Sequence, residues 1–192
     1  MNAREALRHG CGAAVLLLPV CLCAQGARAP LDEVMSLLAQ HRHAEASFTE
    51  EEHLSVLKQP RRSSGRLIYD APDHLEERTL TPRPQTLVLD HGLLTMTFHG
   101  RSRTLPLAQY PQIAPLIDSI RATLAGDRAA LERTFELMFS GSLEHWQLTL
   151  TPRDAQSPLT QIDVTGARDA VSEVSMRQRD GDQSIMHIAA AE

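Results

Sequence analysis

The sequence predicts a mainly β protein in which a curled antiparallel sheet, or incomplete β-barrel, is covered by a helical lid. Apolar and polar residues alternate with a period of two in many short segments, which is typical of strands with one buried face. Turn residues separate these segments by only a few positions, so successive strands are expected to pair as an antiparallel meander. One helical stretch interrupts the series between about residues 109 and 134. Ten or so strands in this order curl into a sandwich or barrel.

The strongest strand signal is a hairpin over residues 86–99. Gly92 completes a turn signal at its centre, because glycine adopts positive φ without a steric penalty. The side chains expected on its apolar face are Leu87, Leu89, Leu94, Met96 and Phe98. This face must pack against a core or a ligand.

The same two periodicities place the other elements. An apolar repeat at three and four positions predicts a helix from Pro30 to about Glu45. In the central insertion a regular helix is expected from near Pro115, and Asp127 caps a short second helix over residues 128–134. The remaining strands are expected from residue 46 and over residues 65–70, 74–81, 102–107, 135–139, 145–151, 159–165, 171–179 and 183–189. Inward positions on these strands include Leu67, Tyr69, Trp146, Leu148, Leu150, Ile162 and Val164.

Residues 1–29 are predicted to be a cleavable signal peptide. Arg4 and Arg8 precede an uncharged, mostly apolar run over residues 11–23, and small residues follow. The run is too short for a transmembrane helix, which needs about 20 apolar residues. Cleavage is expected within residues 24–29, which leaves 30–192 as a single exported domain. The alternatives are an uncleaved N-terminal anchor and a lipoprotein, although neither Cys21 nor Cys23 follows a small residue.

Cysteine content and charge exclude several classes of function. All three cysteines lie in the predicted leader, so the remaining chain has no disulfide and no thiolate site. The leader carries three arginines and one glutamate, and its removal changes the net charge from −5 to about −7. An acidic chain of this kind is a poor nucleic-acid binder. The same net charge argues against adhesion to anionic lipid surfaces.

Candidate catalytic and metal-binding groups are scattered. Nine histidines are present, but His41 and His43 would lie on different faces of a helix and the others occur singly. Adjacent glutamates at residues 50–52 and 76–77 alternate between the two faces of a strand, which favours solvent-facing charges. No nucleophile elbow or phosphate-binding glycine loop occurs. We therefore expect no enzyme, metal or cofactor. A hydrolase would need polar residues that only the fold brings together.

The helical insertion carries an apolar stripe of Leu116, Ile117, Ile120 and Leu124. The stripe is either ordinary core or a lid over an apolar interior. A curled sheet lined by apolar side chains can enclose one elongated ligand. Four methionines would suit such a cavity because thioether side chains repack around irregular ligands: Met96, Met138, Met176 and Met186.

The order of these segments resembles the LolA-like family of periplasmic outer-membrane lipoprotein carriers, in its divergent branch. The matching segments are residues 46–50, 65–72, 75–82, 87–92, 124–127, 146–152, 162–164 and 180–183, with Phe135 after the insertion. The resemblance implies an open β-barrel covered by helices, with a cavity for the acyl chains of a lipoprotein or another lipid-like cargo. It also implies an inner-membrane donor complex and an outer-membrane acceptor. We expect a monomer.

The predicted cavity wall consists of Phe48, Leu67, Tyr69, Leu75, Leu87, Leu89, Met96, Phe98, Trp146, Leu148 and Ile162. Standard carriers of the family hold the lid shut with an arginine where this chain has Ala71, before Pro72. Arg66 and Arg78 are candidates to replace it. The alternative to a carrier is a non-catalytic interaction module of an envelope or lipid-export assembly.

Overall fold

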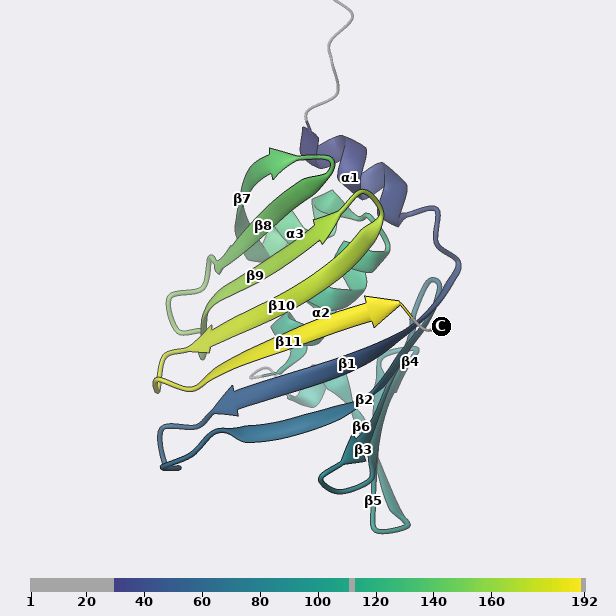
Figure 1. Ribbon diagram of the computed structural model, residues 1–192, viewed down its shortest axis with the longest axis vertical. Helices are drawn as coiled ribbons and strands as arrows, with labels where there is room; N and C mark the ends of the chain where they lie inside the picture. Colours follow the sequence, from purple (N-terminus) through teal and green to yellow (C-terminus); the bar gives the residue numbers. More distant parts are fainter. Residues whose placement is uncertain (1–29, 111–112, 191–192) are drawn as a thin grey trace, which may run out of the picture.

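A computed structural model describes residues 30–110 and 113–190, and the predicted signal peptide lies outside the described residues. The helices are α1 (Pro30–Leu38), α2 (Ala114–Leu124) and α3 (Arg128–Thr134), with a short 3₁₀ helix at Leu107–Gln109 (Figure 1). The strands are β1 (His43–His53), β2 (Arg61–Asp70), β3 (His74–Thr81), β4 (Gln85–Asp90), β5 (Leu93–Phe98), β6 (Arg101–Pro106), β7 (Phe135–Ser142), β8 (His145–Pro152), β9 (Leu159–Ala167), β10 (Ala170–Gln178) and β11 (Gln183–Ala190).

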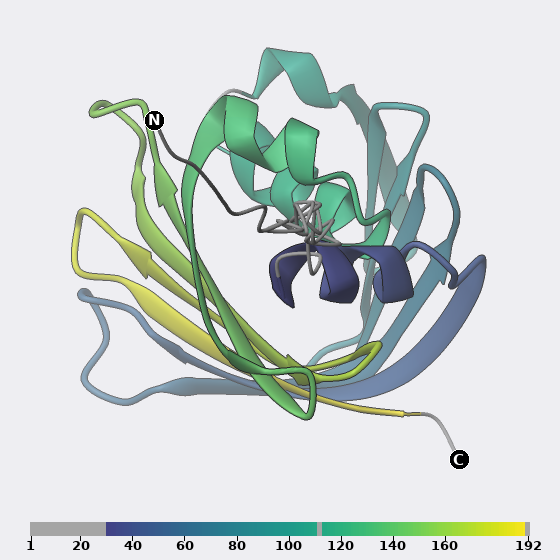
Figure 2. The same ribbon diagram turned by 90° about the horizontal axis from the view of Figure 1, so that it is seen from above.

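All these strands form one antiparallel sheet in the order β6-β5-β4-β3-β2-β1-β11-β10-β9-β8-β7. Consecutive strands are neighbours in the sheet, except β6 and β7, which form its two edges. Strands β1 and β11 pair and join the two halves. Helix α1 precedes β1, and α2 and α3 lie between β6 and β7 in the chain, so none of the three helices interrupts a hairpin. Figure 2 shows that the sheet curves around the helices without closing. The predicted fold class is confirmed.

The register assigns every strand side chain to the concave or the convex face, because directly paired residues share a face. One row across the concave face joins Tyr69, Leu75, Leu89 and Leu94. The next row joins Leu67, Glu77, Leu87 and Met96. The predicted inward faces of these strands are confirmed.

Local structure differs from prediction mainly at the first helix. Helix α1 ends at Leu38, whereas the periodicity predicted a helix to about Glu45. Residues 43–45 instead pair with β2, for example Ala44 with Tyr69, so strand pairing overrides the helical pattern. Helix α3 has the predicted bounds, and its cap is confirmed because Asp127 Oδ1 accepts a hydrogen bond of 2.9 Å from the Ala130 amide.

The main core lies between the helices and the C-terminal half of the sheet. Helix α1 contributes Leu31, Val34, Met35 and Leu38, and α3 contributes Leu131. The strands contribute Phe135, Trp146, Leu148, Leu150, Leu159, Ile162 and Val164. The indole of Trp146 lies over Gly166, where a Cβ atom would collide with it, and its Nε1 donates a 3.1 Å hydrogen bond to the Arg168 carbonyl. Helix packing thus fills this half of the concave face.

Candidate functional site

The concave face divides into a filled half and an open half. Trp146, Leu148 and Ile162 were predicted to line a cavity, and the structure places all three in the main core, each at most 3% exposed. Their neighbours are side chains of α1 and α3. The other eight predicted wall residues lie on β1–β5: Phe48, Leu67, Tyr69, Leu75, Leu87, Leu89, Met96 and Phe98.

Seven of these residues, together with Leu94, lie on the concave face of β2–β5 and form what we call the apolar strip: Leu67, Tyr69, Leu75, Leu87, Leu89, Leu94, Met96 and Phe98. Glu77 interrupts the strip between Leu67 and Leu87. The eighth predicted residue, Phe48, is buried on β1 and pairs with Gly65. Tyr69, Leu89 and Leu94 are buried at the end next to the β2–β3 and β4–β5 turns. Leu87 and Met96, one row further, are only partly buried, and Phe98 is 42% exposed. Burial therefore decreases along the strip, and its outer end is accessible from solvent.

Helix α2 lies inside the curve of the sheet (Figure 2). Its most buried residues are Ser119, Ala122 and Thr123. The two hydroxyl groups donate hydrogen bonds within the helix, from Ser119 to the Leu116 carbonyl and from Thr123 to the Ser119 carbonyl. The most closely packed face of α2 therefore consists of small side chains whose hydroxyl groups are hydrogen-bonded within the helix.

The four apolar residues expected to form one stripe on α2 differ in burial. Leu116 packs against the main core, while Ile117 and Leu124 are partly buried and Ile120 is 36% exposed. At 3.6 residues per turn the four side chains lie within about 100° of one another, so they share one face of α2. The burial of this face is uneven, from Leu116 in the core to the exposed Ile120.

A polar contact ties α2 to the sheet at the buried end of the strip. Arg121 Nη1 lies 2.9 Å from Asp73 Oδ1 in the β2–β3 turn, and Arg121 Nη2 lies 3.2 Å from Asp118 Oδ1. The proposal that Arg66 or Arg78 replaces the missing arginine is wrong, because both lie on the convex face and Arg78 pairs with Glu76. The cation comes from the helix and the carboxylate from the turn two residues after Ala71.

Three glutamates lie on the concave face, Glu77 within the strip and Glu50 and Glu52 on β1. Ser63 Oγ donates a 3.3 Å hydrogen bond to Glu50, and Thr79 Oγ1 donates one of 3.0 Å to Glu77. Burial, reinforced by the charges of Glu52 and Glu77, raises the pKa of Glu50 to about 7. Burial likewise raises the pKa of Glu77. The expectation that these glutamates face solvent is therefore wrong for Glu50 and Glu77, and the alternation of Glu50 with Phe48 on β1 was the signal that could have shown it.

Replacement of Glu50 by glutamine is expected to change the pH dependence of stability. Between the ordinary pKa of 4.5 and about 7, the folded protein binds more protons at Glu50 than the unfolded chain does, so stability falls as the pH rises through this range. Glu50→Gln removes this loss and should stabilise the protein at about pH 8 by about 1–2 kcal/mol, allowing for partial exposure. Thermal unfolding of both proteins should converge at about pH 4.

Glu51→Gln is the matched control, because Glu51 is on the convex face of the same strand. The hydrogen bond from Arg62 lowers the pKa of Glu51, so the pKa shift of Glu51 is opposite in direction to that of Glu50. A gain in stability at high pH for Glu51→Gln, or none for Glu50→Gln, would contradict the assignment.

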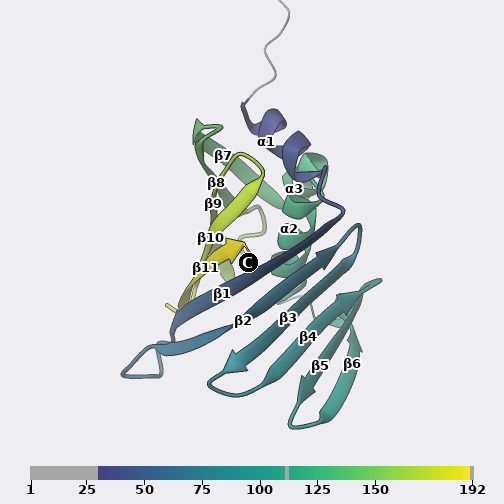
Figure 3. The ribbon, with the colours of Figure 1, turned by 45° about the vertical axis from the view of Figure 1, so that its right-hand side comes forward.

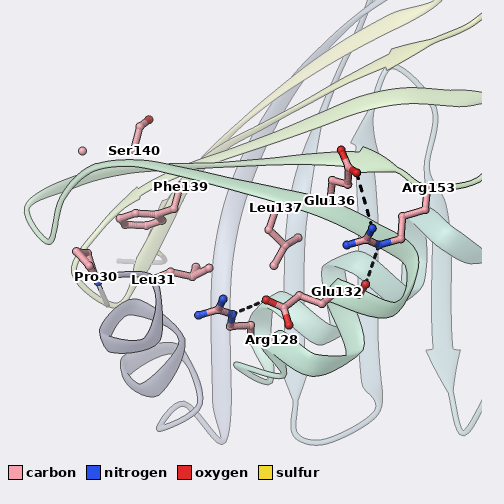
Figure 4. Close-up of a pocket in the computed structure, with 10 residues that line it drawn as sticks. Pro30, Leu31, Arg128, Glu132, Glu136, Leu137, Phe139, Ser140 and Arg153 are labelled. Carbon is pink, nitrogen blue, oxygen red and sulfur yellow. Dashed lines mark hydrogen bonds and ion pairs between the residues drawn. The ribbon is translucent and has the colours of Figure 1, made fainter. Parts of the chain in front are cut away.

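A recess of about 830 Å³ lies apart from the apolar strip, between the start of α1, α3 and the edge strand β7 (Figure 4). Its apolar lining includes Leu31, Leu137 and Phe139. Its charged residues pair with other protein groups: Arg128 with Glu132 at 2.7 Å, and Arg153 with Glu136 at 3.8 Å. No predicted wall residue lines it.

Within residues 30–110 and 113–190, no group of three His, Cys, Asp or Glu side chains is arranged to hold a metal ion. No helix in the same part of the chain is long and apolar enough to cross a membrane.

These features define a class of proteins with an open, curved antiparallel sheet and helices on its concave face. The sequence model for the family described as "Outer membrane lipoprotein carrier protein LolA-like" matches residues 24–192, and the chain belongs to this family. Family members are generally binding or carrier proteins rather than enzymes. Membership therefore indicates a lipoprotein-binding or envelope-associated protein outside the cytoplasm.

Solved structures with a similar fold are distant in sequence. A LolA superfamily protein from Nitrosomonas europaea has a TM-score of 0.46 and 9% identity, over 85% of this chain and 94% of that chain. A DUF1329 family protein from Desulfovibrio piger has a TM-score of 0.48 and 8% identity, over 83% and 91%. MucB, in the Pseudomonas aeruginosa MucA/MucB complex, has a TM-score of 0.42 and 16% identity, over 85% and 59%. Among curated proteins, none matches the sequence.

Proposed function

We propose that this protein is a periplasmic carrier that binds the acyl chains of a lipoprotein, or another lipid-like cargo, on the apolar strip. The observation that supports this most directly is the incomplete burial of large apolar side chains on the concave face, from Leu87 and Met96 to Phe98. Apolar surface exposed to water is unfavourable, and a bound ligand would cover this strip as α1 covers the adjacent half. Residues 30–192 are proposed to act as one exported domain after removal of the leader.

The driving force for binding is removal of apolar surface from water. Each methylene buried contributes about 0.8 kcal/mol, so an acyl chain along the strip is held strongly. We propose that α2, through Ile117, Ile120 and Leu124, covers such a chain as a lid. The Arg121–Asp73 contact, which ties the helix to the sheet, supports this proposal. Release requires α2 to move, which separates this ion pair.

The transfer role needs partners at both membranes. We propose an inner-membrane donor complex and an outer-membrane acceptor. A strip that only binds and releases lipid must receive its cargo from one protein and pass it to another. Two of the solved structures that are similar to this chain are complexes with another protein: MucA/MucB, and the CwlD amidase with the GerS lipoprotein. Protein partners are therefore proposed together with lipid cargo.

The test is direct detection of lipid. Protein purified from the periplasm is expected to release acyl-containing lipid on organic extraction, as detected by mass spectrometry. The delipidated protein should then bind a fluorescent fatty acid with a dissociation constant of about 1 μM or below. The absence of both extracted lipid and probe binding would reject the carrier function.

A further inference from the structure

Three hairpin turns of the N-terminal half lie along one edge of the sheet. Strands β1 to β6 form a meander, so the β1–β2, β3–β4 and β5–β6 turns all occur at the same end of the strands (Figure 3). We call residues 54–62, 80–84 and 98–103 the hairpin rim. Successive turns are two strands apart, or about 10 Å. The Arg121–Asp73 contact is at the opposite ends of these strands.

The hairpin rim concentrates exposed apolar side chains. Val56 is 86% exposed, Leu57 50% and Leu80 56%, and Phe98 adds its ring at the third turn. Four of the eight large hydrophobic side chains that are most exposed in the described residues belong to this rim. Every one of the three hairpins contributes at least one.

The same rim is basic, although the whole chain is acidic. It contains six basic residues and no Asp or Glu: Lys58, Arg61, Arg62, Arg83, Arg101 and Arg103. Arg61 pairs with Glu52 and Arg62 with Glu51 on the neighbouring strand. Within the part of the chain that the structure describes, the other four form no ion pair. The β10–β11 turn ends this basic region, since Asp182 accepts a hydrogen bond from the Ser55 amide.

Exposed apolar side chains interleaved with unpaired cations fit an anionic bilayer surface. The apolar groups enter the boundary between head groups and acyl chains, while lysine and arginine remain at the level of the lipid phosphates. The net charge of about −7 argued against such adhesion, but attraction at a surface depends on the charges within about 10 Å of it. Glu52 and Glu51 neutralise Arg61 and Arg62. The other four rim cations outnumber Asp182, which lies at the end of the rim, so the rim keeps a net positive charge.

We propose that the hairpin rim docks the protein on anionic phospholipid membranes. In this orientation Phe98 and the open end of the apolar strip face the bilayer, so a lipid could pass between them without crossing bulk water. The docking rests on the rim alone. It does not depend on the proposed cargo, and the two are tested by different variants.

The test is flotation with vesicles of phosphatidylcholine alone or with about 30% phosphatidylglycerol. The wild-type protein should bind the anionic vesicles at least about tenfold more strongly, with affinity falling as salt rises from about 50 to about 300 mM. Val56→Ser with Leu57→Ser, and separately Lys58→Glu with Arg83→Glu and Arg101→Glu, should each weaken binding at least about tenfold. All these positions are exposed, and unchanged thermal unfolding will show that the variants fold.

Matched controls lie away from the rim. Met138→Ser removes an exposed apolar side chain on β7, and Arg133→Glu reverses an exposed charge on α3. Both should bind vesicles as the wild type does. Leu87→Glu should also dock normally, which separates docking from cargo binding. Failure of the wild type to bind, equal binding to both vesicle types, or rim variants that bind normally would each overturn the proposal.

Discussion

Leu87→Glu is expected to reduce binding of a fluorescent fatty acid by at least about 30-fold, because it places a carboxylate where the acyl chain would lie. Leu87 lies in the middle of the apolar strip, paired with Glu77 on one side and Met96 on the other. An acyl chain that covers this position would have to desolvate the carboxylate or leave part of the strip unoccupied. Either outcome costs more than the loss of the leucine contacts alone.

Val88→Glu is the matched control for this experiment. Val88 is the next residue of β4 and is also partly buried, but it pairs with Glu76 and Thr95 on the convex face. It should retain binding within about threefold of the wild type. Equal effects of the two substitutions would show that the probe does not bind on the concave face. Circular dichroism of both variants establishes that each is folded.

Leu148→Ala is expected to destabilise the protein by about 2–5 kcal/mol, because it leaves a cavity in a packed core. Leu148 is 1% exposed and contacts the core formed by the helices and β7–β10. The sequence placed this residue in the wall of a ligand cavity. If helical side chains fill the main core, truncation of Leu148 lowers the denaturation midpoint and leaves acyl binding by the folded fraction unchanged.

Met138→Ala tests whether that effect reflects packing. Met138 lies on the neighbouring strand but is 66% exposed, and its truncation should change stability by less than about 0.5 kcal/mol. Chemical denaturation of both variants gives the comparison. A small effect of Leu148→Ala on stability, together with weaker acyl binding, would indicate that the ligand cavity lies in the C-terminal half of the sheet.

The inward residues of the strands were predictable because strand alternation is local. Leu67, Leu87 and Met96 share a face as expected, since side chains at every second position of a strand point the same way. The cap of α3 was predictable for the same reason, because Asp127 acts on an amide three residues away. The end of α1 was not, because residues 43–45 are recruited by pairing with the distant strand β2.

The candidate site was only partly predictable, because periodicity gives a direction but not what lies opposite. Leu148 and Leu87 both follow an inward pattern, yet one meets α1 and α3 while the other remains partly uncovered. An arginine that ties the helical insertion to the sheet was sought at Arg66 and Arg78. Alternation along a single strand could not reveal Arg121, which is on a helix 48 residues beyond Asp73.

The sequence by itself determined a mainly β chain, the inward face of the strands that alternate clearly, the helical insertion and the family resemblance, since all of these depend on local patterns. Only the tertiary structure decided which half of the concave face is filled. It also decided that Glu50 is buried enough to raise its pKa, and that six cations from three turns gather on one rim. The physical reason is that burial and electrostatic potential are set by residues distant in the chain, which strand pairing and curvature of the sheet bring together.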